Sequence, residues 1–208
     1  TPSVAPIATG GRTAALALTT GPAQFATLAP DGGVRFYDPA TGRFSRMGTN
    51  GKPVPLSDRA FPEVRRVAWA PDGNRGILEF PDGANILYDF AKNTQATLPA
   101  HWSSFSFSPA GDRITGKSIG TDRENRWLFE ADPDGSNYRA VESLGIYGGR
   151  VDVAWSPNDQ VIAFARTGDR TGDAQQVILI GRNGENFPGI TVPGQQFRAQ
   201  WSPTGSRV

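Results

Sequence analysis

The stretch at residues 67–73 limits the possible folds more than any other part of the chain, because the chain repeats it. It reads Val-Ala-Trp-Ala-Pro-Asp-Gly, and a second apolar run follows at residues 76–80. Alternation with a period of two is typical of a strand with one buried face. Asp-Gly is a strong turn signal, since glycine accepts the positive φ that a tight hairpin needs. The stretch therefore predicts two antiparallel strands joined by a short turn.

The same pattern returns at residues 105–111, 153–159 and 199–205, and in a weaker form at 26–32. The turn prolines of the five copies follow one another at steps of 38 to 48 residues: Pro30, Pro71, Pro109, Pro157 and Pro203. Repeats of about 40 to 50 residues built from strands are typical of the four-stranded blades of a β-propeller. Helical repeats would need apolar residues at a period of 3.6, and turn-forming residues interrupt nearly every such window.

We therefore expect an all-β fold, a β-propeller of four-stranded antiparallel blades with four blades and the start of a fifth. The expected divisions are an extended linker at 1–12, blades at about 13–60, 61–100, 101–147 and 148–194, and a partial blade at 195–208. In the first blade we expect strands at 13–19, 24–28, 34–37 and 44–47, and we expect loops at 48–61 and 167–175.

The last copy opens a blade that the sequence does not finish. We therefore expect the chain to be a piece of a propeller with about six to eight blades. A self-contained open array or a small closed ring is the alternative.

The charge and residue composition exclude several classes of partner and site. Net charge is +1, with 21 basic and 20 acidic side chains mixed along the chain, and mean hydropathy is −0.39. This balance offers no electrostatic attraction to nucleic acid, and no stretch approaches the ~20 apolar residues of a membrane span. We expect no nucleic-acid partner and no membrane insertion. Cysteine is absent, which excludes disulfides and thiol nucleophiles.

Residues 67–88 and 153–164 resemble the WD-like propeller repeat of bacterial Tol-system periplasmic proteins. They are also similar to the propeller domains of prolyl-oligopeptidase and dipeptidyl-peptidase enzymes. The shared pattern is an apolar strand ending in Trp or Phe, then Ser-Pro-Asp-Gly. Pro-Ala-Gly at 109–111 and Pro-Asn-Asp at 157–159 depart from it but keep a turn-forming tripeptide. The resemblance, together with a start that lacks methionine, implies an exported location, either periplasmic or at the cell surface.

The aromatic residue of each first strand is expected to have a structural role. A large ring at this position fills the wedge between neighbouring blades. We therefore expect these four residues to form the blade core rather than a ligand platform: Trp69, Phe107, Trp155 and Trp201.

Catalytic motifs are missing from the sequence. There is no Gly-x-Ser-x-Gly nucleophile elbow, and the single histidine, His101, would have to serve any Ser-His-Asp triad. A zinc site needs several His or Cys ligands. We expect no catalytic residues, no metal and no cofactor.

Two groups of carboxylates leave room for other chemistry. The first group alternates with turn-forming residues and consists of Asp132, Asp134 and Asn137. We expect these side chains to form hydrogen bonds within their own turn, as in Asx turns, rather than to bind calcium. Three further loop carboxylates would suit glycosidic chemistry only at a suitable separation, which the sequence does not define: Asp122, Glu124 and Asp169.

The connections between blades and the loops between second and third strands should share one face of a propeller. These are the longest loops, and long loops on a rigid scaffold commonly carry binding residues. Arginine and tyrosine are enriched in binding hot spots. The candidate ligand- or partner-binding residues are Arg59, His101, Arg123, Arg126, Tyr147, Arg150 and Arg170.

The expected function is a non-catalytic propeller scaffold that binds a protein, peptide or cell-envelope ligand through this face. The first alternative is the propeller domain of a larger hydrolase of the serine-peptidase type, or a propeller hydrolase acting at its channel. The second is a structural protein that uses an open strand edge for assembly.

Overall fold

The computed structural model describes residues 19, 21–171, 174–194, 200–202 and 205. They form four antiparallel four-stranded sheets, which we number blades 1 to 4 along the chain. The strands are β1 (Gln24–Leu28), β2 (Val34–Asp38), β3 (Arg43–Met47) and β4 (Pro53–Pro55) in blade 1; β5 (Arg66–Trp69), β6 (Arg75–Glu79), β7 (Asn85–Asp89) and β8 (Thr94–Leu98) in blade 2; β9 (Trp102–Phe107), β10 (Ile114–Ile119), β11 (Arg126–Ala131) and β12 (Arg139–Ser143) in blade 3; and β13 (Val151–Val153), β14 (Val161–Thr171), β15 (Ala174–Gly181) and β16 (Asn186–Pro193) in blade 4.

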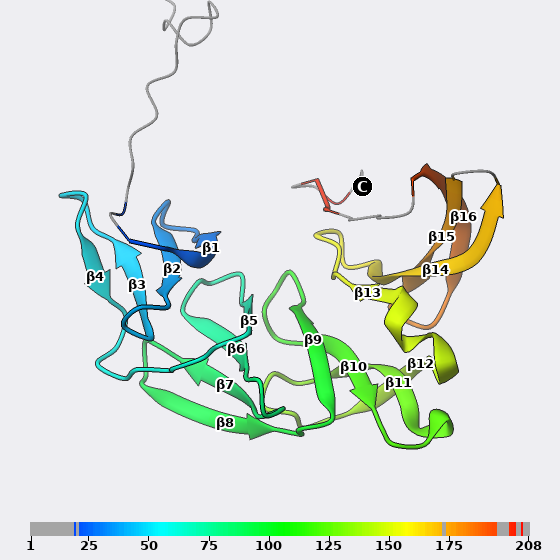
Figure 1. The fold of residues 1–208 in the computed structure, drawn as a ribbon, viewed down its shortest axis with the longest axis horizontal. Coiled ribbons are helices and arrows are strands. Elements are labelled where there is room, and N and C mark those ends of the chain that lie inside the picture. The colour runs from blue at the N-terminus through cyan, green and yellow to red at the C-terminus, as the bar shows by residue number, and fades with distance from the viewer. Residues whose placement is uncertain (1–18, 20, 172–173, 195–199, 203–204, 206–208) are drawn as a thin grey trace, which may run out of the picture.

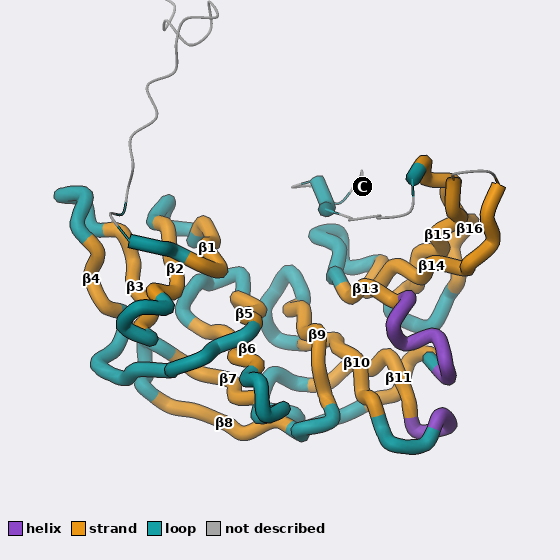
Figure 2. The backbone as a smooth tube through the Cα atoms, viewed as in Figure 1, coloured by secondary structure: helices purple, strands orange, loops and turns teal. Residues whose placement is uncertain are grey.

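Figure 1 shows the blades following one another along an arc, with the first strand of each blade on its inner side. The inner strands β1, β5, β9 and β13 contact one another in that order. Two short 3-10 helices, purple in Figure 2, are η2 (Arg123–Asn125) and η3 (Gly145–Arg150). The predicted all-β architecture of propeller blades is confirmed. No helix in the described part of the chain is long and apolar enough to span a membrane.

Two local expectations differ from the structure. The fourth strand of blade 1 is β4, inside the expected loop at 48–61, and residues 13–18 of the expected first strand lie outside the described residues. A three-residue strand with two prolines escaped the sequence pattern because proline cannot donate to a ladder. The expected loop at 167–175 instead belongs mainly to the β14–β15 hairpin, where Arg170 pairs with Gln175. Most of the expected fifth first strand also lies outside the described residues.

The turns that join first to second strands also connect successive blades. Gly73 and Gly111 have φ of 67° and 71°, a conformation that glycine accepts without strain. Arg75 Nη2 donates to the carbonyl of Gly111 in the next blade at 3.0 Å. Asn158 Nδ2 donates to the carbonyl of Gly205 at 3.2 Å. The repeated turns therefore link each of these blades to the segment that follows it.

Apolar clusters fill the joints between blades. The joint of blades 1 and 2 is rich in aromatic rings, and Phe44 at its centre lies 5.0 to 5.8 Å from the rings of four neighbours, Tyr37, Phe61, Trp69 and Phe90. Phe107 belongs to the cluster that includes residues of blades 2 and 3, and Trp155 to the one that includes residues of blades 3 and 4. The ring centres of Trp201 and Phe164 are 5.0 Å apart, and the indole N–H of Trp201 donates to the carbonyl of Ala154.

Replacing Trp69 with phenylalanine should lower the free energy of unfolding by about 1 kcal/mol. The indole nitrogen of Trp69 donates to the carbonyl of Phe25 in blade 1 at 2.7 Å, and phenylalanine leaves that acceptor without its donor. Urea unfolding monitored by circular dichroism measures the effect. Trp127→Phe, a half-buried tryptophan of β11, is the matched control. An equal loss in both variants would show that ring size, not the hydrogen bond, is responsible.

Candidate functional site

Two of the predicted loops lie side by side at one end of blade 3. They are η2, which joins β10 to β11, and η3, which joins β12 to blade 4. In an antiparallel meander these two connections leave the sheet at the same end, as expected from the sequence. Lys117 anchors η3, because its ammonium donates to the carbonyls of Gly148 at 3.2 Å and Val151 at 3.1 Å. Burial lowers the pKa of Lys117. We call the exposed part of these two elements the η2–η3 surface, residues 121–125 and 145–150.

The η3 part of this surface exposes large side chains. Ile146 is 57% exposed and Tyr147 is 54% exposed. The guanidinium of Arg150 lies 5.2 Å from the centre of the Tyr147 ring, within the range of a cation–π contact. Between them the buried Gly148 faces Ile119, so the turn is packed against the blade. The result is an apolar and cationic patch on a fixed backbone.

Arg126 acts within the η2 loop. Its guanidinium donates to the carbonyls of Gly120 at 3.2 Å and Thr121 at 3.5 Å. The backbone N–H of Gly120 donates to the carbonyl of Asn125 at 3.0 Å, and a Cβ at Gly120 would lie 2.6 Å from that oxygen. Arg126 therefore holds the loop in shape, and glycine is needed at position 120.

A pocket of about 610 Å³ lies on the other side of the η2 loop. It is lined by the rings of Trp102, Trp127 and Tyr138 and by the polar side chains of His101, Thr121 and Asn125, among others. The backbone N–H of Ile119 donates to the carbonyl of His101 at 2.8 Å, which joins the wall to the connection from blade 2. His101 therefore belongs to the pocket, as one exposed wall of it.

The remaining two candidates are not part of this group. Arg59 donates to Gln95 at 2.6 Å, and its guanidinium lies 5.3 Å from the centre of the Phe61 ring, so it belongs to the joint of blades 1 and 2. Arg170 lies in β14, and its side chain is outside the described residues. The structure thus brings the η2 loop with Arg123 and Arg126 into contact with η3, which carries Tyr147 and Arg150. It places His101 in the pocket beside the η2 loop and separates Arg59 from this end of blade 3.

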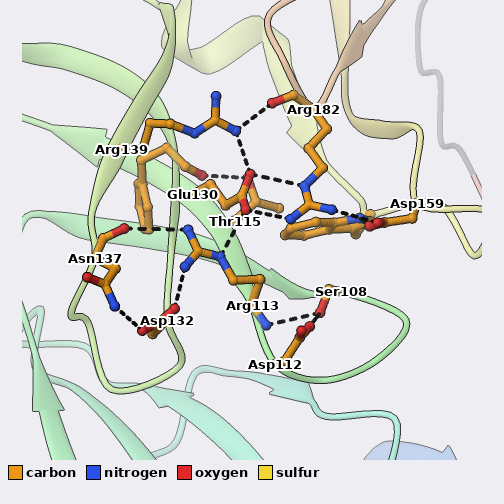
Figure 3. A network of polar contacts seen from close by, with 12 residues as sticks. Ser108, Asp112, Arg113, Thr115, Glu130, Asp132, Asn137, Arg139, Asp159 and Arg182 are labelled. Carbon is orange, nitrogen blue, oxygen red and sulfur yellow. Dashed lines mark hydrogen bonds and ion pairs between the residues drawn. The ribbon is translucent and has the colours of Figure 1, made fainter.

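Sequence reasoning missed a second polar centre, a network around Glu130 (Figure 3). The Glu130 side chain is 3% exposed and accepts from three guanidinium groups: Arg113 at 2.9 Å, Arg139 at 2.7 Å and Arg182 at 2.9 Å. Burial by itself would raise the pKa of Glu130, but these hydrogen bonds outweigh it and lower the pKa to about 2. The carboxylate is therefore held ionised.

Two aspartates complete the network. Asp132 pairs with Arg113, and Asp159 accepts from Arg182 at 2.6 Å and from the indole of Trp155 at 2.7 Å. Three carboxylates thus balance three guanidinium groups. Arg182 lies in the β15–β16 turn of blade 4, so the network ties that blade to blade 3. The ion pair of Arg182 with Glu130 therefore fastens blade 4 to blade 3, and Asp159 pairs with Arg182 within blade 4.

The carboxylates considered for calcium already have partners, within their own turn and, for Asp132, at Arg113. Asp134 accepts from the backbone N–H of Ser136 at 2.9 Å, and Asp132 accepts from Asn137 Nδ2 at 2.5 Å. Asp122 and Glu124 lie exposed in the η2 loop, and the side chain of Asp169 is outside the described residues. Within the described ranges, no three His, Cys, Asp or Glu side chains gather where they could hold a metal ion.

Comparison with known proteins finds similarity in structure only. No family model matches the chain, and no curated protein does. A Vibrio parahaemolyticus oligogalacturonate lyase matches 85% of this chain and 55% of its own, with a TM-score of 0.61 and 11% identity. Kuenenia stuttgartiensis hydrazine synthase matches 90% and 55%, with a TM-score of 0.55 and 14% identity. The Cps50 (Swd1) β-propeller domain of Myceliophteria thermophila matches 90% and 60%, with a TM-score of 0.56 and 10% identity.

The chain spans somewhat more than half the length of each of these structures. At such low identity the likeness concerns the fold alone. Together with the four sheets described above, it identifies the chain as a β-propeller chain.

Proposed function

We propose that this chain is a non-catalytic propeller scaffold that binds a protein or peptide partner through the η2–η3 surface. The observation that carries the proposal is the pair Ile146 and Tyr147, two adjacent large side chains that are both more than half exposed. Clustered exposed apolar residues mark interaction sites, and tyrosine and arginine are frequent in binding hot spots. Arg150 beside Tyr147 supplies both residue types at one place.

The rigidity of η3 supports the proposal. Lys117 and the packing of Gly148 against Ile119 hold the backbone, and the Arg150 contact restrains the Tyr147 ring. A surface that is ordered before binding loses less conformational entropy when a partner docks. Tyrosine adds a large contact area at the cost of only two side-chain torsions.

We also propose that the protein lies in the cell envelope and has a role like that of the Tol-system propeller proteins. Both proposals are supported by the resemblance of the repeats. The propeller domain of a larger hydrolase, or a propeller hydrolase, is the alternative. An enzymatic alternative is kept because the same fold occurs in solved structures named as enzymes, the oligogalacturonate lyases, which are lyases and not hydrolases.

Peptides selected from a random display library on the full chain should bind the η2–η3 surface. The double variant Ile146→Ser/Tyr147→Ser is expected to weaken the selected peptides about tenfold or more, because hot-spot truncations commonly cost over 1 kcal/mol. Isothermal titration calorimetry measures the affinity. Val54→Ser, an exposed apolar side chain of blade 1, is the matched control. Equal affinity for the wild type and the double variant would refute the proposed surface.

A further inference from the structure

The pocket beside His101 has an uncharged lining, unlike the surface of η3 next to it, which carries Arg150. No aspartate, glutamate, lysine or arginine is among the residues that line it. A charged ligand in such a pocket would lose hydration without gaining an ionic partner. Its volume of about 610 Å³ lies in the range of small-molecule sites. The lining therefore favours a neutral ligand.

A stack of rings forms one wall of the pocket. Tyr138 is 44% exposed and stacks on Trp102 at 5.6 Å with 24° between the ring planes. Trp102 in turn lies 4.1 Å from the buried ring of Phe129. The exposed ring is thus supported from behind by two buried rings. An aromatic face is electron-rich and attracts the weakly positive C–H groups on one face of a sugar ring.

Polar side chains complete the lining. An imidazole, a hydroxyl and an amide line the pocket, from His101, Thr121 and Asn125. Each of these groups can both donate and accept a hydrogen bond, which is also what a sugar hydroxyl does. A proline-rich peptide, the other neutral ligand that aromatic grooves take, offers mainly carbonyl acceptors. The mixed donors and acceptors favour the sugar.

The wall that carries Thr121 and Asn125 is formed before any ligand arrives. The Gly120–Asn125 hydrogen bond closes the loop, and Arg126 holds the carbonyls of Gly120 and Thr121. We propose that this pocket binds a neutral saccharide of one or two pyranose rings. Tyr138 stacks on the ring, and His101, Thr121 and Asn125 take its hydroxyls. The pocket shares Thr121 and Asn125 with the η2–η3 surface. The proposal does not depend on a partner at Ile146 and Tyr147, because neither of these two residues lines the pocket.

Saturation-transfer difference NMR on the full chain tests this with methyl glucoside, methyl galactoside, N-acetylglucosamine, maltose and lactose at about 10 mM, where millimolar binding is visible. We expect at least one of these sugars to bind. Tyr138→Ala and Asn125→Ala should each weaken it about tenfold, whereas Tyr138→Phe, which keeps the ring face, should retain most of the affinity. Val54→Ser, an exposed side chain of blade 1 outside the pocket, should leave it unchanged. Circular dichroism checks that each variant is folded.

Three results would overturn the proposal. The first is that none of the five sugars binds, and the second is that Tyr138→Ala and Asn125→Ala both retain the sugar affinity of the wild type. The third is binding of a ten-residue polyproline peptide that Tyr138→Ala abolishes while no sugar competes, which would assign the pocket to a peptide. Loss of peptide binding in the η3 double variant, by contrast, bears only on the proposed protein-binding function.

Discussion

Replacing Glu130 with glutamine is expected to lower the free energy of unfolding by about 3 kcal/mol or more, because breaking a buried ion pair leaves uncompensated charge. The glutamine keeps the size of the side chain but removes the negative charge that three arginines share. Urea unfolding at pH 7 gives the difference. Glu124→Gln, an exposed glutamate of η2, should stay within about 0.5 kcal/mol of the wild type.

The difference in the free energy of unfolding between the wild type and Glu130→Gln should depend on pH, and the direction follows from the lowered pKa of Glu130. The folded-state pKa of Glu130 is lowered from 4.5 to about 2, so its stabilisation is fully present above pH 4.5 and is lost as the pH falls toward 2. The shift corresponds to about 3 kcal/mol. The stability difference between wild type and Glu130→Gln should therefore shrink between pH 5 and pH 2. A difference that is constant over this range would contradict an ionised Glu130 as its source.

Replacing Phe44 with alanine is expected to destabilise the protein by about 3 to 5 kcal/mol, the usual cost of emptying a buried phenylalanine site. Phe44 is fully buried, and four aromatic neighbours surround it in the joint of blades 1 and 2. Those neighbours come from two blades and the connection between them, so the gap cannot close without moving one blade against the other.

Guanidinium chloride unfolding monitored by tryptophan fluorescence measures this effect, since Trp69 contacts Phe44. Phe187→Ala removes a partly exposed phenylalanine from β16 and should cost about 1 kcal/mol or less. A similar loss in both variants would show that the joint is not close-packed around Phe44.

The blades could be predicted because their signals are local. Asp-Gly turns at residues 70–74 and 80–84 lie between alternating strands, and the structure has β5, β6 and β7 there. Each hairpin depends on residues within about ten positions of one another, which a single sequence displays directly. The short strand β4 gave no such signal, because it consists of proline, valine and proline.

The Glu130 network could not be predicted for the opposite reason. Arg113, Arg139 and Arg182 are spread over two blades and meet only in the folded chain. One signal was available, since Glu130 is a charge between Phe129 and Ala131 in an otherwise apolar part of β11. A charged residue at such a position needs a partner, but the sequence does not name it.

The candidate site was predicted in part. Placing η2 and η3 at one end followed from counting strands, and the structure has them in contact. The sequence predicts Arg126 as a residue that binds a ligand or partner, whereas in the structure its guanidinium donates to carbonyls of its own loop. The aromatic wall was missed because Trp102 begins one edge strand of blade 3 and Tyr138 precedes the opposite edge strand, so the two rings are far apart in the sequence and meet only in the folded blade.

The turn-to-turn hydrogen bonds have a direction. Arg75 reaches forward to Gly111, and Asn158 reaches forward to Gly205. In each case the donor residue precedes the acceptor in the sequence, so it leaves the ribosome first. Because domains begin to fold from the N-terminus during synthesis, each blade can dock the next turn as soon as it emerges. At these two joints, a blade that has already folded presents the donor that receives the turn emerging after it.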